Sequence, residues 1–291
     1  MILTKQLTAA RSRHLVFSSV GNHSNLRCWL KGGRGFDLWI TYYGDQSGRG
    51  RAEADYYNER HGSKFQNLHF AYQHCRDIFD RYQAVMVLDD DVVISGSAIS
   101  RLFEYRERYD LWALQPAFSP LGKISWPITR VDRRNTLRYT NFVEMTCPLF
   151  RKDKLDAFMA VYDPTLVGWG CDWWFLETMG DDLCGRVAVV DAIPCVNPHD
   201  SMKGTREIDR LQPAQERKDS WETIKVRYGV RNEQRRFEQY GVIRRDLLAR
   251  LWAQSKGAGV AMWLSGERVR RAGGAAWRGL TGIFSSKPYT G

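Results

Sequence analysis

Residues 84–91, AVMVLDDD, run from five consecutive apolar residues directly into three aspartates. A short apolar run of this kind is typical of a buried strand. Three carboxylates at its end are costly without positive charge, which a divalent cation such as Mn²⁺ or Mg²⁺ supplies. On an extended segment, Asp89 and Asp91 point to one side and Asp90 to the other. We therefore expect Asp89 and Asp91 to act together.

Two interpretations of this triplet stay open at the level of the residues. In the first, Asp91 binds the metal directly and Asp89 contacts a ribose or a metal-bound water. In the second, the triplet is a solvated acidic turn. Its position directly after AVMVL favours a metal site, which would also suit a phosphatase, a nucleotidyltransferase or a nuclease.

Strand and helix patterns alternate on both sides of this segment. Helices are expected at 64–82 and 97–108. The other expected strands are short and buried, at 14–20 (HLVFSSV), 36–43 (FDLWITYY), 111–116 and 187–190. This order predicts an α/β fold, a Rossmann-like and mostly parallel central sheet flanked by helices. Ligands of such sheets bind beyond the carboxyl ends of the strands.

A second candidate segment is Val167–Phe175, VGWGCDWWF, where Asp172 lies among aromatic residues. Partly dry, aromatic surroundings raise the pKa of a carboxylic acid, which suits a general base for a sugar hydroxyl. Trp169, Trp173 and Trp174 are expected to stack on the apolar faces of sugars. The alternative is that WWF belongs to the core and that Asp172 is the N-cap of a helix.

A proline-bracketed loop, residues 194–200 (PCVNPHD), follows the last of these strands. Core packing does not place a histidine in such a loop, and a neutral imidazole at His199 is expected to complete a Mn²⁺ shell. Lys203 and Arg206 lie just beyond it. We expect them to hold a diphosphate as it leaves.

In this order, SSVGN, DDD, GWGCD and a late histidine resemble the motifs of a GT-A type glycosyltransferase. In that type, a DxD motif binds the metal and the donor, and a Gly-Trp-Gly-x-Asp segment lines the acceptor site and often carries the base. The resemblance implies a metal site at Asp89, Asp91 and His199 and a catalytic base at Asp172. It also implies a nucleotide-sugar donor, expected to be UDP-linked, and leaves inversion and retention open.

The donor contacts are expected from positions on the edge of the sheet: Ser19, Asn22, Asp45 and Lys64, together with Asp89 and Lys203. More closely, HLVFSSVGN, GSKFQNL, VLDDDV, GWGCDWWF and NPHD resemble a family called domain of unknown function 707. This resemblance covers roughly residues 13–205.

A basic loop is expected at 119–141, where it would help to form the acceptor pocket. Its arginines suit an anionic sugar or a phosphate, although a solvated loop would have the same composition. The arginines concerned are Arg130, Arg133, Arg134 and Arg138.

The net charge of +10 is unevenly placed along the chain. Residues 1–200 contain 24 Lys and Arg and 24 Asp and Glu, whereas residues 201–291 contain 19 against 9. We expect a catalytic domain at 1–205 and a basic helical region at 206–291. Residues 269–284 place Trp, Leu, Ile and Phe opposite arginines, a pattern that favours an anionic membrane surface. An oligomer contact or packing on the catalytic domain would leave the same pattern.

The sequence thus predicts a metal-dependent glycosyltransferase of bacterial surface-polysaccharide or lipopolysaccharide biosynthesis, with a glycan or lipid-linked acceptor. Without a signal peptide or a long apolar stretch, the protein is expected in the cytoplasm, peripherally bound to the inner face of the membrane. The alternatives are a metal-dependent nucleotidyltransferase or phosphodiesterase, and a non-catalytic membrane- or glycan-binding protein. Nucleic acid is not expected as a partner, because no recognition motif accompanies the basic tail.

Overall fold

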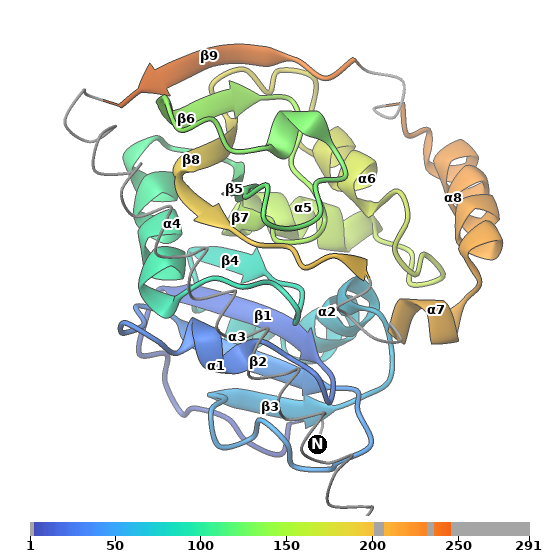
Figure 1. Cartoon of the computed structure of the whole chain (residues 1–291). Helices are drawn as coiled ribbons and strands as arrows, with labels where there is room; N and C mark the ends of the chain where they lie inside the picture. The colour runs from blue at the N-terminus through green and yellow to red at the C-terminus, as the bar shows by residue number, and fades with distance from the viewer. Residues whose placement is uncertain (1–2, 201–206, 232–235, 246–291) are drawn as a thin grey trace, which may run out of the picture. The chain divides into compact units, whose positions relative to one another are not determined.

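The computed structural model describes residues 3–200, 207–231 and 236–245. Within them a single mixed sheet forms in the order β3-β2-β1-β4-β7-β5-β8-β6-β9, which Figure 1 shows from β3 at the bottom to β9 at the top. Its strands are β1 His14–Val20, β2 Asp37–Tyr42, β3 Tyr56–Glu59, β4 Ala84–Val87, β5 Ala113–Phe118, β6 Asn135–Thr140, β7 Leu149–Arg151, β8 Val187–Cys195 and β9 Gln239–Arg244.

The strands of this sheet run mostly in one direction. β1 is parallel to β2 and β4, β2 is parallel to β3, and β5 is parallel to β8. β7 is antiparallel to both β4 and β5, and β6 is antiparallel to β8 and β9. The predicted α/β fold with a mostly parallel sheet is therefore confirmed.

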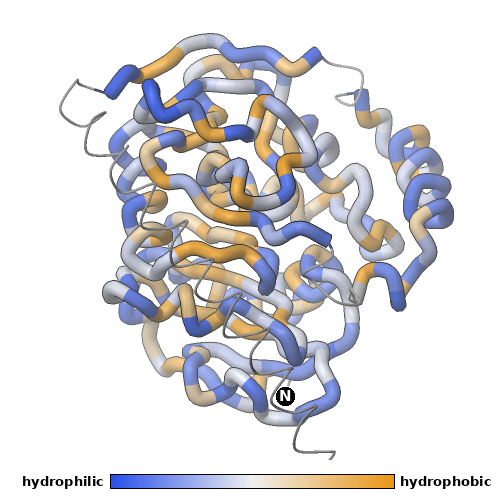
Figure 2. Tube along the Cα trace, in the orientation of Figure 1, coloured by the Kyte–Doolittle hydropathy of each residue, from blue (hydrophilic) through white to orange (hydrophobic). Residues whose placement is uncertain are grey.

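Helices cover both faces of the sheet, and strands such as β2 and β4 are therefore buried on both sides. On β1, Leu15 and Phe17 join a core with α2, α3, α5, α6 and α8, whereas Val16 joins a second core with α1 and α4. Figure 2 shows hydrophobic colours along the central strands and a mainly hydrophilic α8. The helices are α1 Leu26–Trp29, α2 Lys64–His74, α3 Arg76–Phe79, α4 Gly96–Arg108, η1 Pro127–Thr129, α5 Lys152–Val161, α6 Cys171–Thr178, α7 Glu207–Leu211 and α8 Ala214–Tyr228.

Two details differ from the sequence analysis. The helix expected at 64–82 is divided into α2 and α3, because Cys75 leaves the helical conformation (φ −137°, ψ 40°). The segment 119–141 is not a simple loop, since it contains η1 and strand β6. Strand β9, within the predicted basic region, pairs with β6, and the division of the chain at residue 205 stays a prediction.

Much of the predicted basic region, residues 246–291, lies outside the described residues, and so does its predicted amphipathic helix. Among the residues that are described, no helix combines the length and the apolar character needed to cross a membrane.

Arg138 on β6 and Asp191 on β8 form a buried ion pair under the segment that precedes β6. Arg138 Nε lies 2.8 Å from Asp191 Oδ2, and its guanidinium also donates to two backbone carbonyls of that segment, Ile128 O and Arg130 O. From the other side, Asp132 N donates to Asp191 Oδ1 at 2.8 Å. The expected role of Arg138 in binding an anionic acceptor is therefore corrected, because its guanidinium is enclosed by the fold.

Breaking this pair is expected to be costly, since removal of one partner leaves the other charge buried. We expect Arg138→Met to lower the free energy of unfolding by about 3–5 kcal/mol, measured by urea denaturation. The double variant Arg138→Met/Asp191→Leu should recover part of that loss. Equal stability of the wild type and the single variant would contradict this account.

Candidate active site

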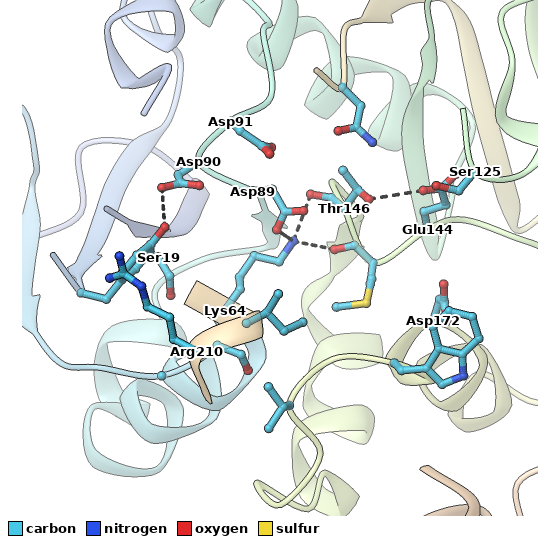
Figure 3. Close-up of a pocket in the computed structure, with 18 of the residues that line it drawn as sticks. Ser19, Lys64, Asp89, Asp90, Asp91, Ser125, Glu144, Thr146, Asp172 and Arg210 are labelled. Atoms are coloured by element: carbon cyan, nitrogen blue, oxygen red, sulfur yellow. Dashed lines mark hydrogen bonds and ion pairs between the residues drawn. The ribbon is translucent and has the colours of Figure 1, made fainter. Parts of the chain in front are cut away.

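A cavity of about 470 Å³ opens at the carboxyl ends of β1, β2, β4 and β8 (Figure 3). It brings together seven residues predicted as site residues: Ser19, Asn22, Asp45, Lys64, Asp89, Asp91 and Asp172. The expectation that ligands approach this edge of the sheet agrees with the position of the cavity. Lys203 and Arg206 lie outside the described residues.

The aspartate triplet forms a turn rather than an extended segment. β4 ends at Val87, and Val92 N donates to Asp89 O at 3.2 Å. The alternation expected of a strand therefore does not apply, and all three aspartates line the cavity. The Asp90 side chain turns toward Gly21 and Tyr43, whereas that of Asp89 turns toward Lys64, and the joint action of Asp89 and Asp91 stays a prediction.

Asp90 ties the ends of three strands together. Its Oδ2 accepts hydrogen bonds from Gly21 N at 2.8 Å and from Tyr43 Oη at 2.9 Å, which follow β1 and β2. Burial and the nearby Asp91 carboxylate raise the pKa of Asp90 to about 7, although both hydrogen bonds stabilise the ionised form. Asp90 thus positions the turn that carries Asp89 and Asp91.

Lys64 lies directly beside Asp89. Its Nζ is 2.6 Å from Asp89 Oδ1 and also donates to Met145 O and Thr146 O, at 2.5 and 3.0 Å. The lysine side chain is 6 % exposed and that of Asp89 is 36 % exposed. A nearly buried ammonium group is therefore fixed next to a carboxylate that faces the cavity. The three N–H groups of the ammonium have acceptors within the protein, so Lys64 contributes positive charge beside Asp89 at the wall of the cavity.

The metal site predicted from the sequence is only partly assembled. Asp89 and Asp91 line the cavity, whereas His199 is exposed and does not. Within the described residues, no three side chains of His, Cys, Asp and Glu are grouped to hold a metal ion. Two carboxylates nevertheless fit Mg²⁺ or Mn²⁺ when substrate phosphates and water complete the shell. The role of His199 as a third ligand stays a prediction.

The side of the cavity next to β1 and β2 carries neutral and acidic hydrogen-bonding groups. The amide of Asn22 donates to Asp45 and accepts from the hydroxyl of Tyr42. Ser19 Oγ accepts from Asn67 Nδ2 at 3.0 Å. These contacts fix polar groups that suit the hydroxyls of a ribose or the edge of a base.

The opposite wall consists of tryptophans around Asp172, which is 5 % exposed. Trp169 and Trp173 line the cavity, as predicted. Trp174 does not, because it packs against Tyr162 and Tyr228 in the core. The alternative given for this segment is correct in its first part, since all of WWF is buried in the core, but wrong in its second, because the N-cap of α6 is Gly170 and not Asp172. Asp172 instead lies in the first turn of α6, where the helix terminus favours a negative charge.

Gly170 shows why this wall requires its glycine. Its φ is +93°, and a Cβ there would lie 2.1 Å from the buried ring of Trp221 on α8. Gly180 has the same φ, but a Cβ there would meet nothing within 4 Å, which makes it a matched control. We expect Gly170→Ala to lower the free energy of unfolding by about 2 kcal/mol more than Gly180→Ala, measured by urea denaturation. Equal losses would show that the ring of Trp221 moves aside at no cost.

The cavity also contains residues that the sequence analysis did not select. Glu144, between β6 and β7, is 3 % exposed and accepts from Thr129 Oγ1 and Thr146 Oγ1. In the sequence, Glu144 stands out as the one acidic residue of the stretch 142–150, whose other residues are apolar or neutral. Arg210 on α7 also lines the cavity. In the sequence it follows Lys203 and Arg206, the residues predicted to hold the leaving diphosphate.

The four arginines expected to bind the acceptor are not part of the cavity wall. Arg138 is buried, and Arg134 pairs with Asp132 at 2.8 Å. The segment contributes other residues instead: Lys123, Ser125 and Trp126.

No family model and no curated protein matches the chain. Among solved structures, the chain is similar to S. aureus TarS 1-349, with 10 % identity and a TM-score of 0.45, over 61 % of this chain and 58 % of that one. It is also similar to TarS 1-349 in complex with UDP-GlcNAc, with 9 % identity and a TM-score of 0.49, over 73 % and 65 %. A putative nucleotide-diphospho-sugar transferase from Desulfovibrio desulfuricans G20 has 11 % identity and a TM-score of 0.35, over 75 % and 98 %.

This chain therefore spans 58 % of the length of the first of these structures. Similarity at these TM-scores supports no inference about chemistry.

Proposed function

We propose that the protein is a metal-dependent glycosyltransferase that moves a sugar from a UDP-linked donor to a hydroxyl group of a glycan. One observation carries this proposal: a single cavity holds the aspartate triplet on one wall and Asp172 among tryptophans on the other. Carboxylates at strand ends suit a diphosphate with its cation, and an acid opposite them suits an incoming hydroxyl. The tryptophan rings beside Asp172 suit the apolar face of a sugar.

The donor is proposed to lie along the ends of β1, β2 and β4. Asn22 and Asp45 would bind the nucleoside, and Asp89 and Asp91 would hold a divalent cation. When bound, that cation supplies positive charge to the diphosphate. Lys64 and Arg210, which line the same cavity, add positive charge where the diphosphate leaves.

The chemical step is a displacement at the anomeric carbon of the donor sugar. The Asp172 carboxylate takes the proton of the acceptor hydroxyl while the acceptor oxygen forms a bond to that carbon. The bond between the carbon and the diphosphate breaks, and its electron pair leaves on UDP. The low exposure of Asp172 keeps water away from the carboxylate that accepts the proton.

We also propose a setting for this reaction, which is supported by the sequence. The basic excess in residues 201–291 suits an anionic membrane surface on the cytoplasmic side, where a lipid-linked acceptor would be presented. Bacterial surface-polysaccharide or lipopolysaccharide biosynthesis uses acceptors of this kind. The motifs quoted above further support membership of the family called domain of unknown function 707.

The first test is calorimetric titration with UDP, GDP and CMP, each with and without Mn²⁺. We expect UDP to bind and its binding to require Mn²⁺. Binding of another nucleotide would change the donor but keep the reaction class. The absence of binding by all three would contradict the proposal. Release of pyrophosphate from UTP, without sugar transfer from any donor, would favour the nucleotidyltransferase instead.

A further inference from the structure

Glu144 is a nearly buried acid for which the proposed reaction has no role yet. Its carboxylate lines the cavity and is held by two hydroxyl groups, Thr129 Oγ1 to Oε1 at 3.0 Å and Thr146 Oγ1 to Oε2 at 3.3 Å. The Glu144 backbone N–H donates to Gln115 Oε1 at 2.5 Å. Both the main chain and the carboxylate are therefore fixed in position.

This carboxylate keeps the capacity to accept further hydrogen bonds. The two oxygens of an ionised carboxylate accept about four hydrogen bonds, and Thr129 and Thr146 supply two. A buried carboxylate is stabilised when its remaining acceptor positions are also satisfied. The hydroxyl groups of a sugar are donors of the kind that would do so.

The position of Glu144 matches that of the sugar to be transferred. Thr146 O accepts from Lys64 Nζ and from Asp89 N, at 3.0 and 2.9 Å, so the segment that carries Glu144 is bonded to the proposed diphosphate site. On the other side, the single proton of Thr129 Oγ1 is shared between Glu144 Oε1 and the carbonyl of Trp126, and the ring of Trp126 contacts Trp173. Figure 3 shows Glu144 on the side of Thr146 away from Lys64.

We propose that Glu144 binds hydroxyl groups of the transferred sugar and selects neutral sugars over uronic acids. This inference rests on the proposed function, because it assumes a UDP-linked sugar in the cavity. An ionised carboxylate repels a carboxylate on the sugar, and repulsion of a competing ligand is an effective source of specificity.

The pKa of Glu144 determines the pH at which the sugar selectivity is measured. Burial raises the pKa of Glu144 to about 7, although the hydroxyls of Thr129 and Thr146 stabilise its ionised form. Among charged neighbours, Asp89 raises this pKa further and Lys123 lowers it. Above pH 7 the carboxylate is mostly ionised, so the selectivity is measured at pH 8.

The experiment is calorimetric titration of the full chain with Mn²⁺ at pH 8. The ligands are UDP, UDP-glucose, UDP-galactose, UDP-GlcNAc and UDP-glucuronate, and the proteins are the wild type and Glu144→Gln. We expect the wild type to bind a neutral UDP-sugar more tightly than UDP-glucuronate. Glu144→Gln should lower the affinity for the tightest-binding neutral UDP-sugar about 10-fold, while the affinity for UDP stays unchanged. The ratio of the affinities for that sugar and for UDP-glucuronate should therefore decrease.

The outcomes separate this inference from the function on which it rests. If the wild type does not bind UDP, the proposed function fails. If UDP binds but Glu144→Gln leaves the order of the sugars unchanged, the role of Glu144 is wrong. A loss of turnover with unchanged affinities would also overturn it, because it would assign Glu144 to proton transfer.

A folding control accompanies the main variant. Glutamine has the shape of glutamate, and the hydroxyls of Thr129 and Thr146 are able to accept from its amide. If Glu144→Gln loses UDP binding and thermal stability together, Glu144→Asp decides the question, because it keeps the charge but withdraws the carboxylate by one methylene. Retained UDP binding with weaker binding of the neutral sugar would then support the proposal, and unchanged sugar binding would overturn it.

Discussion

An Asp91→Asn variant is expected to lose Mn²⁺-dependent UDP binding and to turn over a UDP-sugar about 10³-fold more slowly. The substitution keeps the size of the side chain but removes the negative charge that would hold the cation. With only Asp89 left, and that carboxylate 2.6 Å from Lys64 Nζ, little negative charge remains for a metal. The measurements are calorimetry with UDP and Mn²⁺ and the rate of UDP release from UDP-sugars.

The matched control is Asp77→Asn on α3. Asp77 is exposed, pairs across one helical turn with Arg81, and does not line the cavity. The Asp77→Asn variant changes the net charge by the same amount as Asp91→Asn does, and it should bind UDP as the wild type does. If Asp91→Asn binds UDP and Mn²⁺ with unchanged affinity, the proposed role of Asp91 in metal-dependent donor binding is wrong.

The sequence was sufficient to locate one edge of the sheet and the residues gathered there. Strand β1 has the bounds that were predicted, and β4 was missed by one residue at its end. Because parallel strands place their carboxyl ends on the same edge, residues far apart in the chain, such as Ser19, Asp45 and Asp89, could be assigned to one site before the structure was known.

Other features depend on tertiary contacts that no local pattern reveals. Strand β6 lies in a segment whose basic composition is typical of a solvated loop. Arg138 can be buried there because Asp191, 53 positions away, compensates its charge. No local pattern reveals Glu144, because the cavity that it lines is assembled from segments far apart in the chain. The turn at Asp89–Asp91 depends on where β4 stops pairing, and the pattern of apolar residues does not specify that point.

Substitution of Asp172, the catalytic base predicted from the sequence, should have the second large effect on the rate of sugar transfer. We expect Asp172→Asn to lower kcat for sugar transfer by about 10²–10⁴-fold and to leave the affinity for UDP and Mn²⁺ unchanged. Asparagine cannot take the proton of the acceptor hydroxyl. Its side-chain oxygen still accepts from Trp173 N, which donates to Asp172 Oδ1 at 3.1 Å, so the start of α6 is preserved. Transfer of radiolabelled sugar from the UDP-sugar to bacterial membrane extract measures the rate.

The control for this variant is Asp153→Asn, which removes an acid from the first turn of α5, the position that Asp172 occupies in α6. Asp153 pairs with Arg151 at 2.6 Å and does not line the cavity. Any effect common to acids at helix starts appears in both variants, whereas an effect of proton transfer appears only in Asp172→Asn. If transfer by Asp172→Asn is as fast as transfer by Asp153→Asn, the proton goes elsewhere. The assignment of Asp172 as the catalytic base would then be wrong.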